Sequence, residues 1–278
     1  YKKKHGVIKS NSGASLIDLG DGIALLEFHS RSNAIGLDIM QMINFAVDEV
    51  EKNYKGLVIG NQGKNFCVGA NLGMILMEAQ DDNIFELDLT IRTFQNAMLK
   101  LKYSSKPVVA APFGMTLGGG AEVILPAARV QASMETYMGL VEAGVGLIPG
   151  GGGNKELYMK QLKGLPNHVT ADYVNVAAGV FESIATAKVS TSADEARQNN
   201  FLNFVDHISV NSDHLIYDAK QLALALHDSG YQAPRREKVP VAGEAGYAAM
   251  LLGAEGMLLS GYISEHDMKI AKKLAYVL

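Results

Sequence analysis

Hydrophobic and polar positions alternate along the N-terminal half of this chain in a repeating order. Two apolar stretches, 14–18 and 23–28, flank Gly20-Asp21-Gly22, which predicts a hairpin with an Asp-Gly turn. Apolar residues then recur at helical spacing after Asp38, which we expect to cap this helix; they are Ile39, Ile43, Ala46, Val47 and Val50. A strand at 57–60 follows directly. The order repeats, with a helix from about residue 84 to 101 before a strand at 107–112, and therefore predicts an α/β fold with crossover helices.

The C-terminal part of the chain has a different pattern. Helical periodicity is continuous over 213–227, 243–260 and 264–277, and Gly230, Pro234 and Pro240 interrupt it between the first two segments. We therefore divide the chain into a catalytic core, residues 1–190, and a helical C-terminal region, residues 191–278.

A glycine triplet is the most informative short motif. Gly118, Gly119 and Gly120 follow the apolar run 107–112 and are closed by Glu122. Glycines after a buried strand let the backbone approach a ligand, and a helix that starts there directs unpaired N–H groups at it. The motif predicts an anion-binding turn with an acid beside it. A tight strand-to-helix turn with a solvated glutamate would leave the same pattern.

Two further blocks favour the functional interpretation. Residues 64–72 again place small residues after an apolar run, and residues 139–153 supply a second carboxylate, Glu142, twenty positions after the first. In this order and spacing, the matches at 66–72, 118–122 and 142–152 resemble the crotonase (enoyl-CoA hydratase/isomerase) superfamily. The resemblance implies the crotonase-like spiral of β-β-α units, an α/β fold, followed by the helical C-terminal region.

The resemblance also implies roles for particular residues. The backbone amides of Ala70 and Gly119 would form an oxyanion hole for the thioester carbonyl of an acyl-CoA substrate. Glu122 would mainly activate water, and Glu142 would mainly deliver a proton to the α-carbon. The remaining residues expected to bind substrate come from the same motifs and from the loop that would receive the adenine of coenzyme A: Arg31, Ser32, Asn33, Gly69, Asn71, Leu72 and Gly118.

These residues lead to an enoyl-CoA hydratase, a lyase of fatty-acid β-oxidation, as the predicted function. Two alternatives stay open. A Δ3,Δ2-enoyl-CoA isomerase usually lacks one of the two glutamates, and a catalytically silent acyl-CoA-binding and oligomerisation module would be expected to lose both. The segment 74–77, Met-Ile-Leu-Met, could line an acyl pocket or pack as ordinary core.

Composition limits the other possibilities. The chain has 278 residues, 48% of them hydrophobic and 19% charged, as expected for a globular protein with a sizeable core. Its net charge of −4 argues against a nucleic-acid partner. Cys67, the single cysteine, fits a reducing compartment and a buried position. We find neither a secretory signal nor an apolar run long enough to span a membrane, and we predict a cytoplasmic protein.

Cofactors and partners follow from the same observations. The seven histidines are scattered without metal-site spacing, and Gly144-Val145-Gly146 is not continued as a dinucleotide-binding fingerprint. We expect no metal and no cofactor besides the acyl-CoA substrate. The apolar C-terminal helices predict a homo-oligomer, although a fused arrangement could cover the same surface within one chain. The elongated helical part of the chain resembles the hydratase region of bacterial fused enzymes, which is linked to a 3-hydroxyacyl-CoA dehydrogenase. Because the chain does not begin with Met and the passage 155–192 is long, we expect it to be one region of such a longer polypeptide.

Overall fold

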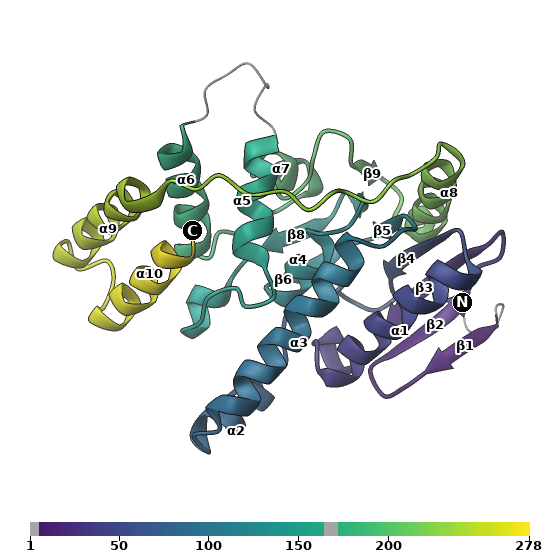
Figure 1. Cartoon of the computed structure of the whole chain (residues 1–278), viewed down its shortest axis with the longest axis horizontal. Coiled ribbons are helices and arrows are strands. Elements are labelled where there is room, and N and C mark those ends of the chain that lie inside the picture. The colour runs from purple at the N-terminus through teal and green to yellow at the C-terminus, as the bar shows by residue number, and fades with distance from the viewer. Residues whose placement is uncertain (1–5, 164–171) are drawn as a thin grey trace.

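A seven-stranded sheet forms the centre of the computed structural model, which describes residues 6–163 and 172–278 (Figure 1). Its strand order is β1-β2-β3-β4-β5-β7-β9; β1, β2 and β3 pair antiparallel, and the pairs from β3 onward are parallel. A second, two-stranded sheet pairs β6 with β8 in parallel. The strands are β1 (Val7–Ser10), β2 (Ala14–Asp18), β3 (Ile23–Phe28), β4 (Gly56–Gly60), β5 (Val108–Ala110), β6 (Gly114–Leu117), β7 (Arg129–Ser133), β8 (Thr136–Gly139) and β9 (His207–Ser209).

Helices and short 3₁₀ turns connect and cover these strands. The helices are α1 (Leu37–Asn53), α2 (Leu72–Gln80), α3 (Ile84–Lys102), α4 (Gly119–Ile124), α5 (Gly153–Lys163), α6 (Tyr173–Ala185), α7 (Ala193–Gln198), α8 (Leu215–Asp228), α9 (Gly243–Leu259) and α10 (Glu265–Val277), and the 3₁₀ turns are η1 (Arg31–Asn33), η2 (Glu142–Val145) and η3 (Ser212–His214). Twice the chain passes from the large sheet to the small one, from β5 to β6 and from β7 to β8, and then enters a helix or turn. This is the predicted spiral of β-β-α units.

Both faces of the large sheet are buried, which explains the continuous apolar runs of its central strands. Because successive side chains point to opposite faces, Leu26 packs in the core shared with α1 and α3, whereas Leu25 packs with Ala219 and Ala223 of α8. The predicted hairpin is confirmed as β2 and β3, with Asp21 and its flanking glycines at positive φ.

The start of α1 differs from the prediction. Gly36, not Asp38, is its N-cap residue. The Asp38 side chain instead accepts a hydrogen bond from Ser12 Oγ at 2.9 Å, and its carbonyl accepts one from Asn11 Nδ2 at 2.7 Å. Asp38 therefore joins the first turn of α1 to the β1–β2 connection, where its negative charge still suits a helix N-terminus.

The C-terminal region contains the predicted helices, as α8, α9 and α10. It is not purely helical, because β9 lies in it and pairs with β7. α8 lies against the sheet, whereas α9 and α10 pack on each other and on α6 and extend away from the sheet (Figure 1). The boundary at residue 190 therefore lies before a strand and a helix that complete the main sheet layer.

Candidate active site

The glycine triplet places a short buried helix, α4, against the loop that precedes α2. Gly118 has φ 53° and ψ −121°, a conformation that favours glycine, and its N–H donates to Gly139 O at 2.9 Å. A Cβ atom on Gly120 would lie 2.5 Å from the carbonyl oxygen of Cys67. Only glycine therefore permits this approach of helix and loop.

Two backbone N–H groups are left without an acceptor where helix and loop meet. Ile35 N donates to Gly69 O and Asn71 N donates to Ile35 O, both at 2.9 Å, so the peptide groups around Ala70 are fixed while its own N–H has no acceptor among the described residues. The N–H of Gly119, at the first position of α4, has none there either. A Cβ atom on Gly119 would lie 3.2 Å from Ala70 N, which places the two groups side by side.

Glu122 is held by backbone amides. Its side chain is buried, and its Oε1 accepts hydrogen bonds from Gly151 N and Gly153 N, each at 2.8 Å. Both glycines are needed, because a Cβ atom on Gly151 would lie 2.8 Å from Glu122 Oε2 and one on Gly153 would lie 3.0 Å from Oε1. Burial raises the pKa of this carboxyl to about 7, and the amide hydrogen bonds oppose that rise.

Glu142 has no such partners. It opens η2, and both of its carboxyl oxygens are buried without a hydrogen-bond partner. Burial raises its pKa to about 8, and the charge of Glu122 adds to the rise. Its Oε1 would lie 3.3 Å from a Cβ atom on Gly118, so the carboxyl group points at the start of α4. The two acids therefore face one space, and burial raises the pKa of both.

That space is a cavity of about 240 Å³. Both glutamates and the unpaired N–H groups belong to its wall, and most of the remaining lining is apolar. Predicted site residues in the wall are Gly69, Ala70, Leu72, Gly118, Gly119, Glu122 and Glu142. Of the segment 74–77, Met74 and Ile75 line the cavity, whereas Leu76 and Met77 are 57% and 66% exposed, so this segment is a pocket wall and not core.

The predicted adenine loop lies apart from this cavity. Ser32 and Asn33 adopt positive φ in η1 and line a separate cavity of about 510 Å³ with Lys64, while Arg31 is exposed and lines neither. The Asn33 side chain donates to Asn65 O at 2.9 Å, which fixes the loop. Asn71 does not line the apolar cavity; its side chain accepts from Met74 N at 3.4 Å as the N-cap of α2.

Sequence reasoning missed the partners of Glu122. The glycine run 150–153 was part of the motif, but nothing in the sequence indicated that the amides of Gly151 and Gly153 would hold a carboxyl group thirty residues upstream. Phe94, from α3, was also missed as a wall residue of the cavity. Its helical periodicity marks it as apolar and inward-facing, which does not separate a pocket wall from ordinary core.

Other candidate chemistry is limited. Cys67 is buried, as expected, and burial raises the pKa of its thiol to about 12. Over residues 6–163 and 172–278, no group of three or more His, Cys, Asp or Glu side chains is arranged to hold a metal ion. In the same residues no helix combines the length and apolar character that crossing a membrane requires.

Comparison with known proteins identifies the family. The enoyl-CoA hydratase/isomerase family model matches residues 18–167, more than half of the chain. The chain belongs to this family. The solved structure of an enoyl-CoA hydratase from Bacillus anthracis superposes with a TM-score of 0.62 over 95% of this chain and 90% of that one, at 20% identity, which confirms the fold.

Two curated relatives are much longer than this family member. A protein of Bacillus subtilis named probable 3-hydroxyacyl-CoA dehydrogenase is 70% identical over 277 residues, which are 100% of this chain and 34% of the relative. A putative fatty acid oxidation complex trifunctional enzyme of Rickettsia felis is 31% identical over 219 residues, which are 79% of this chain and 29% of the relative. The chain thus spans about a third of the length of these relatives.

Proposed function

We propose that the chain is an enoyl-CoA hydratase that adds water to a trans-2-enoyl-CoA to give a 3-hydroxyacyl-CoA. The observation that carries the proposal is the shared wall of the apolar cavity. There two buried carboxyl groups, one held by backbone amides and one without a hydrogen-bond partner, face two adjacent N–H groups that have no acceptor among the described residues. The structure of the B. anthracis hydratase gives the fold alone, and the reaction is inferred from the site.

The N–H groups of Ala70 and Gly119 would receive the thioester carbonyl oxygen. Addition of water at the β-carbon moves negative charge onto that oxygen, and one donor aimed at such a developing oxyanion contributes roughly 2.7–4 kcal/mol to the transition state. Because neither N–H has another acceptor among the described residues, both are available for this purpose.

The two glutamates would divide the proton transfers. Glu122, whose carboxylate the amides of Gly151 and Gly153 favour, accepts a proton from water as the oxygen bonds to the β-carbon. Glu142, whose carboxyl oxygens have no hydrogen-bond partner and whose pKa is raised by burial and by the charge of Glu122, is the neutral acid and delivers its proton to the α-carbon. One proton leaves water and one proton is added to the α-carbon, so the step involves no net change of protons or electrons and needs no cofactor besides the thioester itself.

Loss of the enoyl-thioester absorbance of crotonyl-CoA tests the proposal. A hydratase consumes this absorbance and yields 3-hydroxybutyryl-CoA. No hydration by the unmodified, folded chain would contradict the proposal and favour the silent module. Formation of the conjugated enoyl-CoA from a 3-enoyl-CoA, with hydration absent, would favour the isomerase.

We further propose that this hydratase works with a linked 3-hydroxyacyl-CoA dehydrogenase, which would oxidise its product. The names and lengths of the two relatives support this arrangement. The chain alone is then expected to bind no NAD, as measured by calorimetry. A native reading frame of only this length, or NAD binding by this chain, would contradict the arrangement. The predicted cytoplasmic location stays a prediction.

A homo-oligomer is proposed for the same chain. Leu252, Leu259, Tyr262 and Tyr276 are each more than 70% exposed on or beside α9 and α10, an apolar surface that a second copy would cover. Light scattering at micromolar concentration should give a multiple of 29.8 kDa. The mass of a single chain would contradict this proposal.

A further inference from the structure

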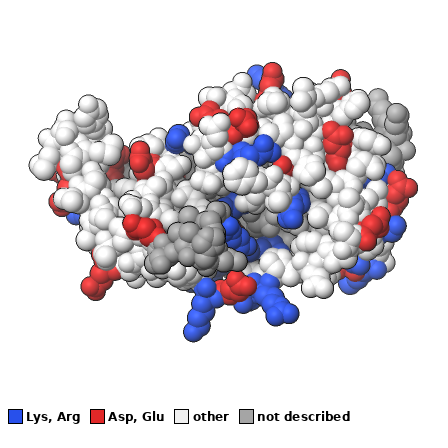
Figure 2. Space-filling model, turned by 90° about the horizontal axis from the view of Figure 1, so that it is seen from above, with Lys and Arg blue, Asp and Glu red and all other residues white. Residues whose placement is uncertain are grey.

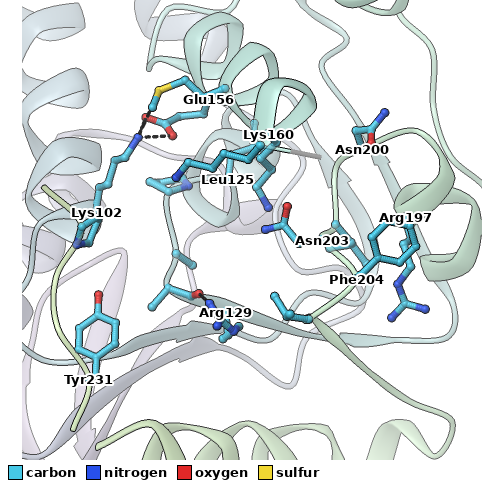
Figure 3. A pocket seen from close by; sticks show the side chains of 18 of the residues that line it. Lys102, Leu125, Arg129, Glu156, Lys160, Arg197, Asn200, Asn203, Phe204 and Tyr231 are labelled. Carbon is cyan, nitrogen blue, oxygen red and sulfur yellow. Dashed lines mark hydrogen bonds and ion pairs between the residues drawn. The ribbon is translucent and has the colours of Figure 1, made fainter. Parts of the chain in front are cut away.

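A second large cavity lies at the other end of α4. It has a volume of about 480 Å³ and shares no lining residue with the cavity that contains the two glutamates. Side chains from several elements meet there: Lys102 at the end of α3, Arg129 at the start of β7, Lys160 in α5, Arg197 in α7 and Tyr231 after α8. Lys and Arg side chains gather in a hollow of the face seen in Figure 2, and Figure 3 shows the cavity itself.

The charge of the lining is strongly unbalanced. Its cations are Lys102, Arg129, Lys160, Lys163 and Arg197, and its one acid is Glu156. Glu156 is already engaged, because its carboxylate accepts from Lys102 Nζ at 2.7 and 2.8 Å and also pairs with Lys155 at 2.8 Å. Of the remaining cations, Lys160 and Arg197 have only long ion pairs of 3.9 Å, to acids outside the lining. Arg129 and Lys163 have no ion pair among the described residues.

Lys160 shows the imbalance most clearly. Its side chain is 9% exposed, its Nζ donates to Phe201 O at 3.0 Å, and its nearest acid is Asp206 at 3.9 Å. The Asp206 carboxylate is itself occupied by the N–H groups of Val130 and Asn203. Burial lowers the pKa of Lys160. A buried ammonium is costly unless it is paired, and its pair with Asp206 is long, so an anion bound in the cavity would stabilise it further.

Helix ends account for only part of this charge. Lys160, Lys163 and Arg197 lie in last turns, where a cation is favoured by the helix dipole. Arg129 lies at the start of a strand, and its guanidinium donates only to Ala128 O, at 2.7 Å, and forms no ion pair within the described residues. In Figure 3 the Arg129 and Lys160 side chains approach the cavity from opposite sides, with Asn203 beside Lys160.

An aromatic ring completes the lining. Phe204 is 90% exposed, although it follows two buried residues, Phe201 and Leu202, in the same loop. Figure 3 places it at the edge of the cavity, next to Arg197. An exposed aromatic ring beside guanidinium and ammonium groups is the combination that binds a base by stacking and a phosphate by charge.

We propose that this cavity binds the terminal diphosphate of a nucleoside diphosphate, with Arg129 and Lys160 on the phosphates and the base stacked on Phe204. The diphosphate of NAD joins two nucleosides and has no terminal phosphate, so NAD is not the ligand. Its volume lies within the range of about 300–1,000 Å³ found for small-molecule sites. A terminal diphosphate also distinguishes this ligand from an acyl-CoA, whose diphosphate joins two groups. The cavity shares no lining residue with the one that contains the two glutamates, so we treat its occupant as a second ligand.

Calorimetric titration of the 278-residue chain with inorganic pyrophosphate and with ADP tests the proposal. Both should bind with one-to-one stoichiometry, and Arg129→Gln should weaken each about tenfold or more, because a hydrogen bond to a charged group is lost. Lys163→Gln should also weaken both ligands, and because Lys163 is an exposed residue of the same lining, this variant does not disturb the core. Lys100→Gln, which removes an equal charge from a residue paired with Asp48 outside the cavity, is the control and should bind both as before.

The Phe204→Ala variant distinguishes binding of a nucleotide from binding of a free diphosphate. It should weaken ADP about tenfold and leave pyrophosphate unchanged, because stacking involves the base alone. Equal effects on both would contradict the stacking role. The proposal is overturned if pyrophosphate gives no saturable binding, if Arg129→Gln and Lys163→Gln bind as tightly as Lys100→Gln, or if pyrophosphate competes with crotonyl-CoA in the hydration assay.

Discussion

The two carboxyl groups of the apolar cavity come from segments that differ in burial and in bonding. Glu122 lies in α4, all of whose residues are buried, and two backbone amides hold one of its oxygens. Glu142 opens η2, none of whose residues is buried as a whole, yet both of its oxygens are enclosed and unpartnered. Burial thus raises the pKa of both carboxyl groups, and the amides of Gly151 and Gly153 favour the ionised form of Glu122.

Removing either acid should have the largest effect. Glu122→Gln and Glu142→Gln each keep the shape of the side chain and remove its proton transfer, and each should lower the turnover of crotonyl-CoA about 10²–10⁴-fold. If the two act as a unit, the double variant will lose far less than the product of the single losses. Full activity in either single variant would refute the division of roles between the two segments.

Disturbing the support of Glu122 should have the next largest effect. In Gly151→Ala the new Cβ would lie 2.4 Å from Phe94 Cε1 and 2.8 Å from Glu122 Oε2, which displaces the amide that holds this acid. We expect a loss of turnover of about tenfold or more and a destabilisation of about 1–3 kcal/mol from overpacking.

Gly150→Ala is the matched control for this change. Its Cβ would meet only Ile91 Cγ2, at 3.9 Å, so turnover and the urea midpoint should stay near those of the unmodified chain. If both alanine variants show the same turnover, then the amide hydrogen bonds to Glu122 do not determine its role as the base.

The pH dependence should sharpen the comparison further. Hydration needs one acid ionised and one neutral, so turnover should be greatest between about pH 7 and about pH 8 and should fall several-fold on both sides. The turnover number for crotonyl-CoA, measured by its loss of absorbance at a series of pH values, would check this dependence. A rate that is flat from about pH 6 to about pH 9 would contradict the assignment of acid and base.

Stability should change with pH in one direction. Both folded pKa values lie above the ordinary value of 4.5, so the folded chain binds more protons than the unfolded chain between these values. The contribution of the pair to the free energy of unfolding is therefore complete below about pH 4.5 and is lost as the pH rises through about 7 to 8. Urea unfolding below about pH 4.5 and above about pH 8 measures this loss of stability. The loss should be smaller in Glu142→Gln than in the unmodified chain.

The smallest effect on activity is expected from a change in η1, outside the two segments that carry Glu122 and Glu142. Asn33→Ala removes the hydrogen bond to Asn65 O that fixes η1. If this loop receives the adenine of coenzyme A, the KM for crotonyl-CoA should rise a few-fold while the turnover number stays the same, because a net hydrogen bond contributes about 0.5–1.5 kcal/mol. An unchanged KM would show that η1 lies outside the substrate site.

Much of this arrangement could be predicted from the sequence. Runs such as 57–60 and the periodicity of 84–101 located a central strand and α3, and the three motifs brought Ala70, Gly119, Glu122 and Glu142 to one cavity. These features are local, so a pattern of neighbouring residues contains them. The cap of α1 was misplaced, because the choice between Gly36 and Asp38 depends on a contact with Ser12.

The rest depends on contacts between distant segments. The hold of Gly151 and Gly153 on Glu122 joins residues about thirty positions apart, and no periodicity marks it. The basic cavity draws on α3, α5, β7 and α7, so its cations appear in the sequence only as scattered, ordinary charges. β9 was missed because a strand of three residues, His207–Ser209, is too short to show alternation.

The reactivity of Cys67 should report on separation of α4 from the Ala70 loop. The thiol is buried directly behind the contact between α4 and the Ala70 loop, and burial raises its pKa to about 12. Thiolate is the reactive form, so alkylating reagents at neutral pH should label the chain only when this contact separates. The labelling rate then measures how often the two N–H donors part, and a bound acyl-CoA should slow it in proportion to its occupancy.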